Sequence, residues 1–482
     1  MKNHAVGAGT PAETVSRAEF LNLFASVFLP MFMAAVDQTL LATATPAIAA
    51  SLGGLRDTSW IAVGYLLASA TIVPVYGRLG DRRGRRDVLL VALGVFTLGS
   101  LACGLAQSLP QLVAARILQG LGGGGLMTLS QALIGELVPP RERARFQGYF
   151  ALVFTAASVT GPVVGGLVVS NASWRWLFLA NLPLAAFAAW RLARLPKGEK
   201  HPPAARGADL PGHVLFAVGA LCTLFWLTSG GHRFAWGSVP SLALLATGAV
   251  ALGLLWRQER RHPAPFLPLD LLHERTVALS AVVVALFASC LFAVVFFLPV
   301  YLQLGHEMSA QGSGLLLLPL TAGMVIGSLS SSRILARTGR PHWIPVVGLS
   351  LSSAALFALA LMPANQALIG GLAFVTGLGF GCVMPTTQVT MQTVAGRERL
   401  GVVTALMALA RSTGGAAGAA LFGAVAFAMM PAAAAHGRSV MSAFHAGFLV
   451  FAAVAAAAAF TASRIPPLKL WESARKSGSD PK

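Results

Sequence analysis

The chain alternates between long apolar stretches and short polar ones. Apolar runs of roughly 20 residues recur along its whole length, which is the length an α-helix needs to cross the hydrocarbon core of a bilayer. We expect fourteen such helices, near residues 20–49, 57–77, 88–107, 111–135, 146–169, 174–194, 212–230, 239–256, 276–302, 312–332, 342–362, 366–386, 400–427 and 442–463. The pattern therefore predicts an all-α, multi-pass integral membrane protein.

The distribution of basic residues tests this count. Short loops rich in Arg and Lys stay on the cytoplasmic side of a membrane. With fourteen spans, all but six of the 35 Lys and Arg residues fall in loops assigned to the cytoplasm or in the termini. Four lie on the opposite side (Arg56, Arg175, Arg233 and Arg438), and Arg116 and Arg411 lie inside helices. This bias predicts that both termini are cytoplasmic, because a miscounted span would abolish it.

Composition narrows the class further. The net charge of +18 would suit nucleic-acid binding, but the basic residues lie between apolar runs and form no basic domain, so we expect no nucleic-acid partner. The four cysteines fall inside apolar segments without CxxC spacing, so no metal site or redox cofactor is expected. The N-terminus lacks a short h-region with an A-x-A site, which argues against a cleaved signal peptide. The Ala- and Arg-rich composition suggests a bacterial chain, in the cytoplasmic (inner) membrane.

Two Pro- and charge-rich segments, residues 195–211 and 257–275, bracket the two central helices. The predicted organisation is an N-terminal six-helix lobe (1–194), linkers with two extra helices (195–275), a C-terminal six-helix lobe (276–463) and a cytoplasmic tail (464–482). Repeated six-helix halves are how many secondary transporters build two lobes around a midplane site.

The segment GRLGDRRGRRD (Gly77–Asp87) packs five arginines and two aspartates into eleven residues. Such a cluster cannot enter lipid, so we expect a short cytoplasmic loop there. A weak repeat, SSRILARTGR (Ser331–Arg340), follows the second helix of the last six in the same way.

These segments carry a family resemblance. GRLGDRRGRR resembles the loop between helices 2 and 3 of the major facilitator superfamily (MFS). The chain resembles, over nearly its whole length, the 14-helix drug:proton antiporters of that superfamily (the DHA2 group, similar to the EmrB/QacA exporters). The other motifs that carry the likeness are VDQTLLATATPAI (Val36–Ile48), LVAARILQGLGGG (Leu112–Gly124), SVTGPVVGG (Ser158–Gly166), SWRWLFLANLP (Ser173–Pro183) and LARSTGGAAGAALFG (Leu409–Gly423). Ala42 and Thr43 depart from the usual first-helix pattern.

Asp37 is the one carboxylate predicted to lie within the hydrocarbon region, and such residues mark functional sites. From about Leu21, Asp37 lies roughly 24 Å along the first helix, and Arg116 enters from the opposite face by roughly 8 Å. The depths sum to about the ~30 Å of the hydrocarbon core, so the two side chains are expected to meet. A proton-coupling pair and a static structural pair are both consistent with this placement.

The predicted substrate-binding residues are apolar or aromatic, with one arginine, because flexible Met and aromatic side chains suit amphipathic ligands. They are Met31, Met33, Phe150, Phe154, Phe292, Phe296, Tyr301 and Arg411. Arg411 is placed near the midplane, where it either faces the cavity or binds carbonyls within its own bundle.

The resemblance implies a gate at the cytoplasmic loop and a seal or hinge in the fifth helix. The gating residues are Gly77, Asp81, Arg82, Gly84, Arg85, Arg86, Gly161, Pro162, Gly165 and Gly166. The alternative for the loop is a purely topogenic charge cluster. GLGGGG (Gly120–Gly125) lacks the Lys-Ser/Thr of a phosphate-binding loop, so close packing of the fourth helix explains it better.

The sequence thus predicts a transporter and not an enzyme: a proton-coupled antiporter that exports hydrophobic or amphipathic compounds by alternating access. The expected partners are the small-molecule substrate, protons and the lipid bilayer, and the chain is expected to be monomeric. Export of a lipid or metabolite, with or without a periplasmic adaptor protein, is the second hypothesis. A membrane sensor or enzyme is the third, but the sequence shows neither a nucleophile–base pair nor a soluble domain.

Overall fold

The computed structural model describes residues 17–54, 57–137, 143–195, 209–230, 233–262, 269–362, 365–396, 399–429 and 438–467. These residues form helices and connecting turns, and their one β-type pairing is an isolated bridge between Gly230 and Phe234. The helices are α1 (Arg17–Leu52), α2 (Ser59–Arg83), α3 (Arg85–Leu105), α4 (Leu109–Leu137), α5 (Arg143–Asn171), α6 (Trp176–Leu179), α7 (Asn181–Ala193), α8 (Leu210–Ser229), α9 (Val239–Glu259), α10 (Leu269–Leu272), α11 (Arg275–Gly305), α12 (Ala310–Leu315), α13 (Leu318–Thr338), α14 (Ile344–Leu361), α15 (Gln366–Gly381), α16 (Val383–Ala395), α17 (Leu400–Ala428) and α18 (Arg438–Ser463).

Every predicted span coincides with a helix or with two consecutive helices. Three spans are broken near their ends or middle, between α6 and α7, between α12 and α13, and between α15 and α16. Twelve stretches among the described residues are long and apolar enough to cross a membrane. The chain is therefore an all-helical, multi-pass membrane protein.

One prediction was wrong in detail. Gly77–Asp87 is not a loop, because α2 continues to Arg83 and α3 begins at Arg85. Only Gly84 interrupts the helices, with φ +94°, a backbone conformation that favours glycine. Arginine has good helix propensity and extends its charged end into water, so charge in this segment did not end either helix.

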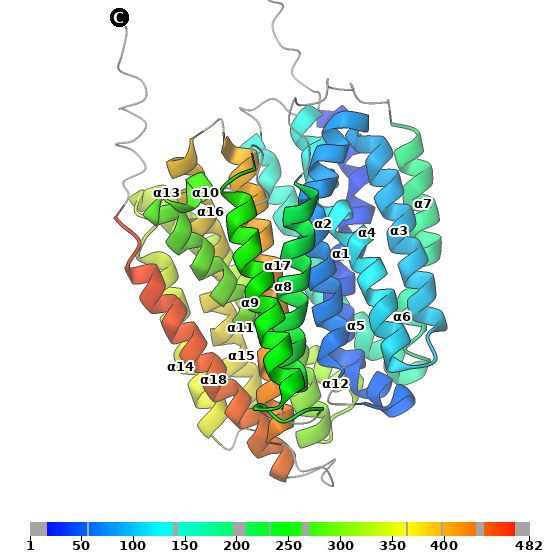
Figure 1. The fold of residues 1–482 in the computed structure, drawn as a ribbon, viewed down its shortest axis with the longest axis vertical. Helices are drawn as coiled ribbons and strands as arrows, with labels where there is room; N and C mark the ends of the chain where they lie inside the picture. The colour runs from blue at the N-terminus through cyan, green and yellow to red at the C-terminus, as the bar shows by residue number, and fades with distance from the viewer. Residues whose placement is uncertain are drawn as a thin grey trace, which may run out of the picture.

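The helices form two bundles and a hairpin (Figure 1). Helices α1–α7 pack mainly on one another, as do α11–α18. The hairpin of α8 and α9 lies across the junction between the bundles, where α8 contacts both α2 and α17. A hydrogen bond of 2.8 Å from Trp60 Nε1 to Thr228 Oγ1 fixes α8 to the start of α2.

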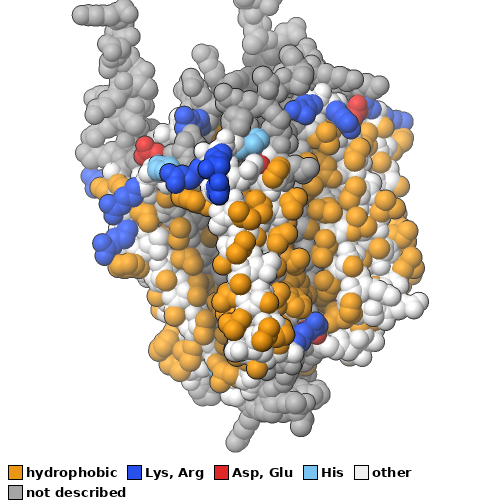
Figure 2. All heavy atoms as spheres, viewed as in Figure 1, with side chains coloured by type: hydrophobic (Ala, Val, Ile, Leu, Met, Phe, Trp, Pro, Cys, Tyr) orange, Lys and Arg blue, Asp and Glu red, His pale blue; other side chains and the backbone are white. Residues whose placement is uncertain are grey.

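Charge and hydrophobicity are segregated on the surface. Figure 2 shows hydrophobic side chains over the lateral face, and most Lys and Arg side chains along one end of the bundles. We call this the basic end; α2 ends there, and α3 begins there. The opposite end, where α1 and α8 finish, is called the far end, and there Arg233 pairs with Asp57 at 2.8 Å.

Candidate functional site

The buried ion pair is the centre of the candidate site. Asp37 of α1 is 2% exposed and Arg116 of α4 is fully buried, and Arg116 Nη1 donates to Asp37 Oδ2. Gln119, one turn further along α4, donates from Nε2 to Asp37 Oδ1 at 2.8 Å. Both carboxylate oxygens thus accept hydrogen bonds, a donor set that suits an ionised aspartate, which can only accept. The structure brings Asp37 and Arg116 together, as the predicted depths required.

A wider polar network holds these groups in place. Ser100 of α3 accepts from Gln119 Nε2 at 2.8 Å and from Asn181 Nδ2 of α7 at 3.3 Å. Gln119 Oε1 accepts from Arg116 Nη1 at 2.5 Å. The network therefore joins α1, α3, α4 and α7, and Gln119 lies at its centre. Sequence reasoning missed Gln119, Ser100 and Asn181, although the i, i+3 spacing of Arg116 and Gln119 places both on one helix face.

Helix α2 completes the surroundings of the arginine. Arg116 Nε donates to the Ile61 carbonyl at 3.1 Å, and the guanidinium lies 4.3 Å from the centroid of the Tyr65 ring. The hydroxyl of Tyr65 donates to the Ala34 carbonyl of α1 at 3.4 Å. A desolvated guanidinium is stabilised by such cation–π contact as well as by its hydrogen bonds. Tyr65 is a further site residue that the sequence did not indicate.

The network lies where α2 and α3 pack closely against α4. A Cβ on Gly99 of α3 would lie 2.5 Å from the backbone of Gln119, and a Cβ on Gly120 would clash with the Tyr65 carbonyl. The glycine run after Gln119 continues this contact, since Gly122 meets the backbone of Phe96. The run thus serves helix packing, as predicted.

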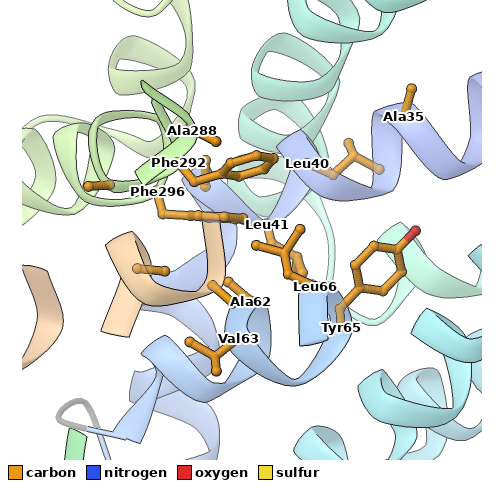
Figure 3. Close-up of a cluster of buried hydrophobic side chains, with 14 of the residues drawn as sticks. Ala35, Leu40, Leu41, Ala62, Val63, Tyr65, Leu66, Ala288, Phe292 and Phe296 are labelled. Carbon is orange, nitrogen blue, oxygen red and sulfur yellow. The ribbon is translucent and has the colours of Figure 1, made fainter. Parts of the chain in front are cut away.

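A seam between the two bundles lies beside the site. Figure 3 shows Phe292 and Phe296 of α11 pointing toward Leu40 and Leu41 of α1, with Tyr65 on the neighbouring turn of α2. The Phe292 and Phe296 rings stack with centroids 5.9 Å apart, and both side chains are buried. These two predicted substrate-binding residues therefore lie where the bundles meet.

The remaining predicted substrate-binding residues are dispersed. Met31 and Met33 are buried on α1. Arg411 is half-buried on α17, the helix of the second bundle that packs against α2. Tyr301 is buried within the second bundle against α18, away from the Phe292–Phe296 pair. The side chains of Phe150 and Phe154 lie outside the described residues.

The gate residues predicted within Gly77–Asp87 lie at the basic end. Arg85 Nη1 donates to the Ala132 carbonyl of α4 at 2.5 Å. Arg86 donates to two carbonyls at the end of α7, Leu192 at 2.9 Å and Ala193 at 2.6 Å. The positive charges therefore lie against carboxyl ends of helices, where the helix dipole favours them. Gly77 and the exposed Arg82 lie in the last turns of α2.

Asp81 belongs to the last turn of α2 by its backbone, and its side chain lies outside the described residues. The predicted pairing of Asp81 with basic groups therefore stays a prediction.

The fifth-helix motif lies on the seam. Gly161 and Gly165 of α5 face α1, where a Cβ on Gly165 would lie 2.6 Å from the Leu40 carbonyl. Gly166 faces α12, with the Ala310 carbonyl 2.6 Å from a Cβ, and Gly314 of α12 meets the Pro162 carbonyl in turn. The motif thus packs α5 against both bundles.

Comparison with known proteins identifies the class. The Major Facilitator Superfamily model matches residues 27–419, so the chain belongs to this superfamily. The D-xylose–proton symporter structure shares the fold, with a TM-score of 0.65, 16% sequence identity, and coverage of 94% of this chain and 98% of that one.

The sequence relatives of this chain include proteins that are named as exporters. The multidrug transporter protein MdtP of Bacillus subtilis is 33% identical over 405 residues, covering 84% of this chain and 74% of the relative. The tetracenomycin C resistance and export protein of Streptomyces glaucescens is 34% identical over 421 residues, covering 86% and 77%. An uncharacterized MFS-type transporter of Mycobacterium tuberculosis, MT1926, is 35% identical over 433 residues, and this chain spans 87% of its own length but 61% of that protein.

Proposed function

We propose that this protein is a proton-coupled antiporter that exports hydrophobic or amphipathic compounds by alternating access. The observation that carries the proposal is the buried network of Asp37, Arg116 and Gln119 beside an aromatic seam between two bundles. The exporter names of the relatives support a drug-like or antibiotic substrate. No cofactor is proposed.

The proton is proposed to bind Asp37. A proton on the Asp37 carboxylate removes the negative charge that pairs with Arg116. The Arg116 guanidinium still donates to Gln119 Oε1 and to the Ile61 carbonyl. The arginine therefore does not lose all its partners when Asp37 is neutral. Arg116 lies over Tyr65 of α2, and α2 packs against α17, so movement of Arg116 can be transmitted to the second bundle through this pair of helices.

The proposed topology has fourteen spans. It adds α5 and α17, each of 29 residues, to the twelve apolar stretches. The first six spans (1–194) and the last six (276–463) form the two lobes, the α8–α9 hairpin lies within 195–275, and 464–482 is the tail. The basic end then faces the cytoplasm of a bacterial cell with both termini, because arginine-rich loops stay inside. The functional unit is proposed to be a monomer.

The test is transport by purified protein in liposomes that carry an imposed pH gradient. A panel of dyes and antibiotics would be offered while a pH-sensitive dye reports proton flux. Substrate-dependent proton movement in the wild type, lost in Asp37→Asn and kept in Asp57→Asn, is the expected result. Asp57 is a matched control because its ion pair with Arg233 lies at the far end, on the surface. Near-normal antiport by Asp37→Asn would refute the proposal.

A second candidate is export of a lipid or metabolite by the same fold, with or without a periplasmic adaptor. The apolar seam at Phe292 and Phe296 favours it as much as it favours drugs. The same panel separates the two, because only a lipid exporter would move labelled phospholipid between leaflets while ignoring the drugs.

A further inference from the structure

A second cluster of titratable side chains lies in the other bundle, apart from the Asp37 network. Tyr301 of α11 is fully buried, and its Oη lies 3.0 Å from His445 Nε2 of α18. The same hydroxyl lies 3.1 Å from Nε2 of His306, the residue after α11 ends. The rings of Phe444 and Phe448 pack on Tyr301 with centroids 5.9 and 5.5 Å away. One phenol thus bridges two imidazoles inside an aromatic enclosure.

The hydrogen-bond pattern of this cluster fits neutral imidazoles. A hydroxyl has one proton and two lone pairs, and a neutral imidazole has one donor and one acceptor nitrogen. Tyr301 therefore donates to one histidine while the other histidine donates to Tyr301. If the accepting imidazole takes a proton, both histidines become donors toward Oη, and the Tyr301 O–H needs another acceptor. Burial also lowers the pKa of His306, in keeping with a neutral ring.

The surroundings add little charge. Met441 and Phe422 approach from α18 and α17 beside the two phenylalanines, and Thr43 of α1 and Ser313 of α12 lie near the end of α11; all are uncharged. Glu307 follows His306 and is exposed, and Arg438, whose side chain is not described, begins α18 seven residues before His445. Among the described side chains, the two imidazoles are therefore the titratable groups in direct contact with Tyr301.

The same end of α11 also holds the two bundles together. Gln303 Nε2 donates to the Thr43 carbonyl of α1 at 3.1 Å and to Ser313 Oγ at 2.9 Å. Thr43 lies six residues after Asp37, about 9 Å along α1. Tyr301 lies two residues before Gln303, in the last turns of the helix that makes this contact between the bundles.

We propose that His306, Tyr301 and His445 form a second proton-binding site, in the second bundle, which takes a proton from the far side and releases this closed contact. The step is protonation: an imidazole nitrogen lone pair accepts H⁺, and no other covalent bond forms. The Tyr301 O–H then loses that nitrogen as its hydrogen-bond acceptor. Because the form described here, with the Gln303–Thr43 contact made, suits neutral histidines, acidification of the far side favours a form in which this contact is broken. The transition falls below the ordinary histidine pKa of about 6.5. The inference rests on the proposed function for the exchanged ion and for the orientation of the far end toward the outside.

Histidine NMR tests proton binding without requiring transport. The ¹⁵N-histidine-labelled protein in lipid nanodiscs would be titrated from about pH 8 to 5, with His306→Gln and His445→Gln to assign the signals. Two mutually dependent titrations are expected, with that of His306 below the ordinary histidine pKa of about 6.5 because its ring is partly buried. In Tyr301→Phe the two titrations should become independent, because no phenol then bridges the imidazoles, and in His273→Gln, an exposed histidine near α10, they should stay mutually dependent. Independent titrations that Tyr301→Phe leaves unchanged would overturn the proposal.

Transport provides the second readout. With the inner pH fixed, the export rate of the wild type should change when the outer pH falls from 6.5 to 5.5. The change is up to about tenfold for each unit of pKa difference between the two forms. His445→Gln, which keeps a hydrogen-bonding side chain, should have an altered outer-pH profile that retains only the dependence imposed by the pH gradient on Asp37-coupled export. An unaltered outer-pH profile in His445→Gln would refute the site, and absence of any export by the wild type would refute only the proposed function.

Discussion

The buried arginine is stabilised by acceptors on three helices and by an aromatic ring. Arg116 Nε reaches the Ile61 carbonyl, Nη1 reaches both Asp37 and Gln119, and the guanidinium face lies over Tyr65. Removing one partner from such a buried pair costs about 3–5 kcal/mol, since the remaining charge is uncompensated. An amide at position 37 keeps one of the two acceptor oxygens, and for this reason Asp37→Asn separates proton binding from folding better than Asp37→Ala.

Gln119 is expected to be as important as the ion pair. Gln119→Leu removes the donor to Asp37 Oδ1, the bond to Ser100 and the acceptor for Arg116. A hydrogen bond to a charged group is worth about 1.5–3 kcal/mol, so we expect export to slow by roughly tenfold or more. Initial rates in liposomes, normalised to inserted protein, measure this. Gln107→Leu, on an exposed glutamine, is the control, and equal rates for the two variants would contradict the assigned role.

The ion pair was predictable from sequence, but its neighbours were not. Asp37 and Arg116 were found because a charged residue inside an apolar run is conspicuous, and helix rise converts position into depth. Gln119, Ser100 and Tyr65 are buried polar residues of kinds that occur in many helices. Which of them face Asp37 depends on how α2, α3 and α4 rotate about their axes, and this is fixed only by tertiary packing.

At the scale of helices, α5 is one of the elements that join the two bundles. Its glycines contact α1 on one side and α12 on the other, so any added atom must push one of these helices away. Small residues at helix crossings in membranes allow such close backbone approach. The sequence motif correctly located this contact, while the partner helices became known only from the structure.

Gly165→Ala tests this packing. The new Cβ would lie 2.6 Å from the Leu40 carbonyl and from Thr43 Oγ1, so the α1–α5 contact must widen. We expect a lower Tm and slower export. Gly94→Ala is the matched control, because nothing lies within 4 Å of a Cβ on Gly94 of α3, and alanine is favoured over glycine in helices by about 1 kcal/mol. If Gly165→Ala has the same Tm and export rate as Gly94→Ala, α5 does not form the tight contact described.

The α2–α3 junction gives a second test at this scale. Arg85 holds the end of α4 and Arg86 holds the end of α7, far along the helices from Asp37. Arg85→Ala and Asp81→Asn are therefore expected to slow export without weakening substrate binding. Binding by fluorescence titration and transport rates should be measured on the same preparations. A large loss of affinity with unchanged conformational exchange would contradict a role in gating.

At the scale of the whole molecule, charge inside the membrane is unbalanced. The predicted hydrocarbon region holds one carboxylate, Asp37, and two arginines, Arg116 and Arg411. The carboxylate is already paired with Arg116, and Arg411 lies on α17, which packs against α2. On the surface, most basic side chains gather at one end of the bundles and the lateral face is apolar (Figure 2). The interior near the seam is thus a poor environment for additional positive charge.

We therefore expect neutral or weakly charged substrates to be preferred over dications. A dication near Asp37 would leave at least one positive charge poorly compensated, at a cost that burial of a charge makes high. Exchange of a neutral substrate for one proton also moves positive charge inward, so the membrane potential drives export by about 2.3 kcal/mol per 100 mV. Matched neutral, monocationic and dicationic compounds should be assayed at zero and negative-inside potential. Export of the neutral compound should be fastest and should accelerate with potential, whereas saturable, high-affinity export of the dication that outcompetes its neutral analogue would refute this electrostatic account.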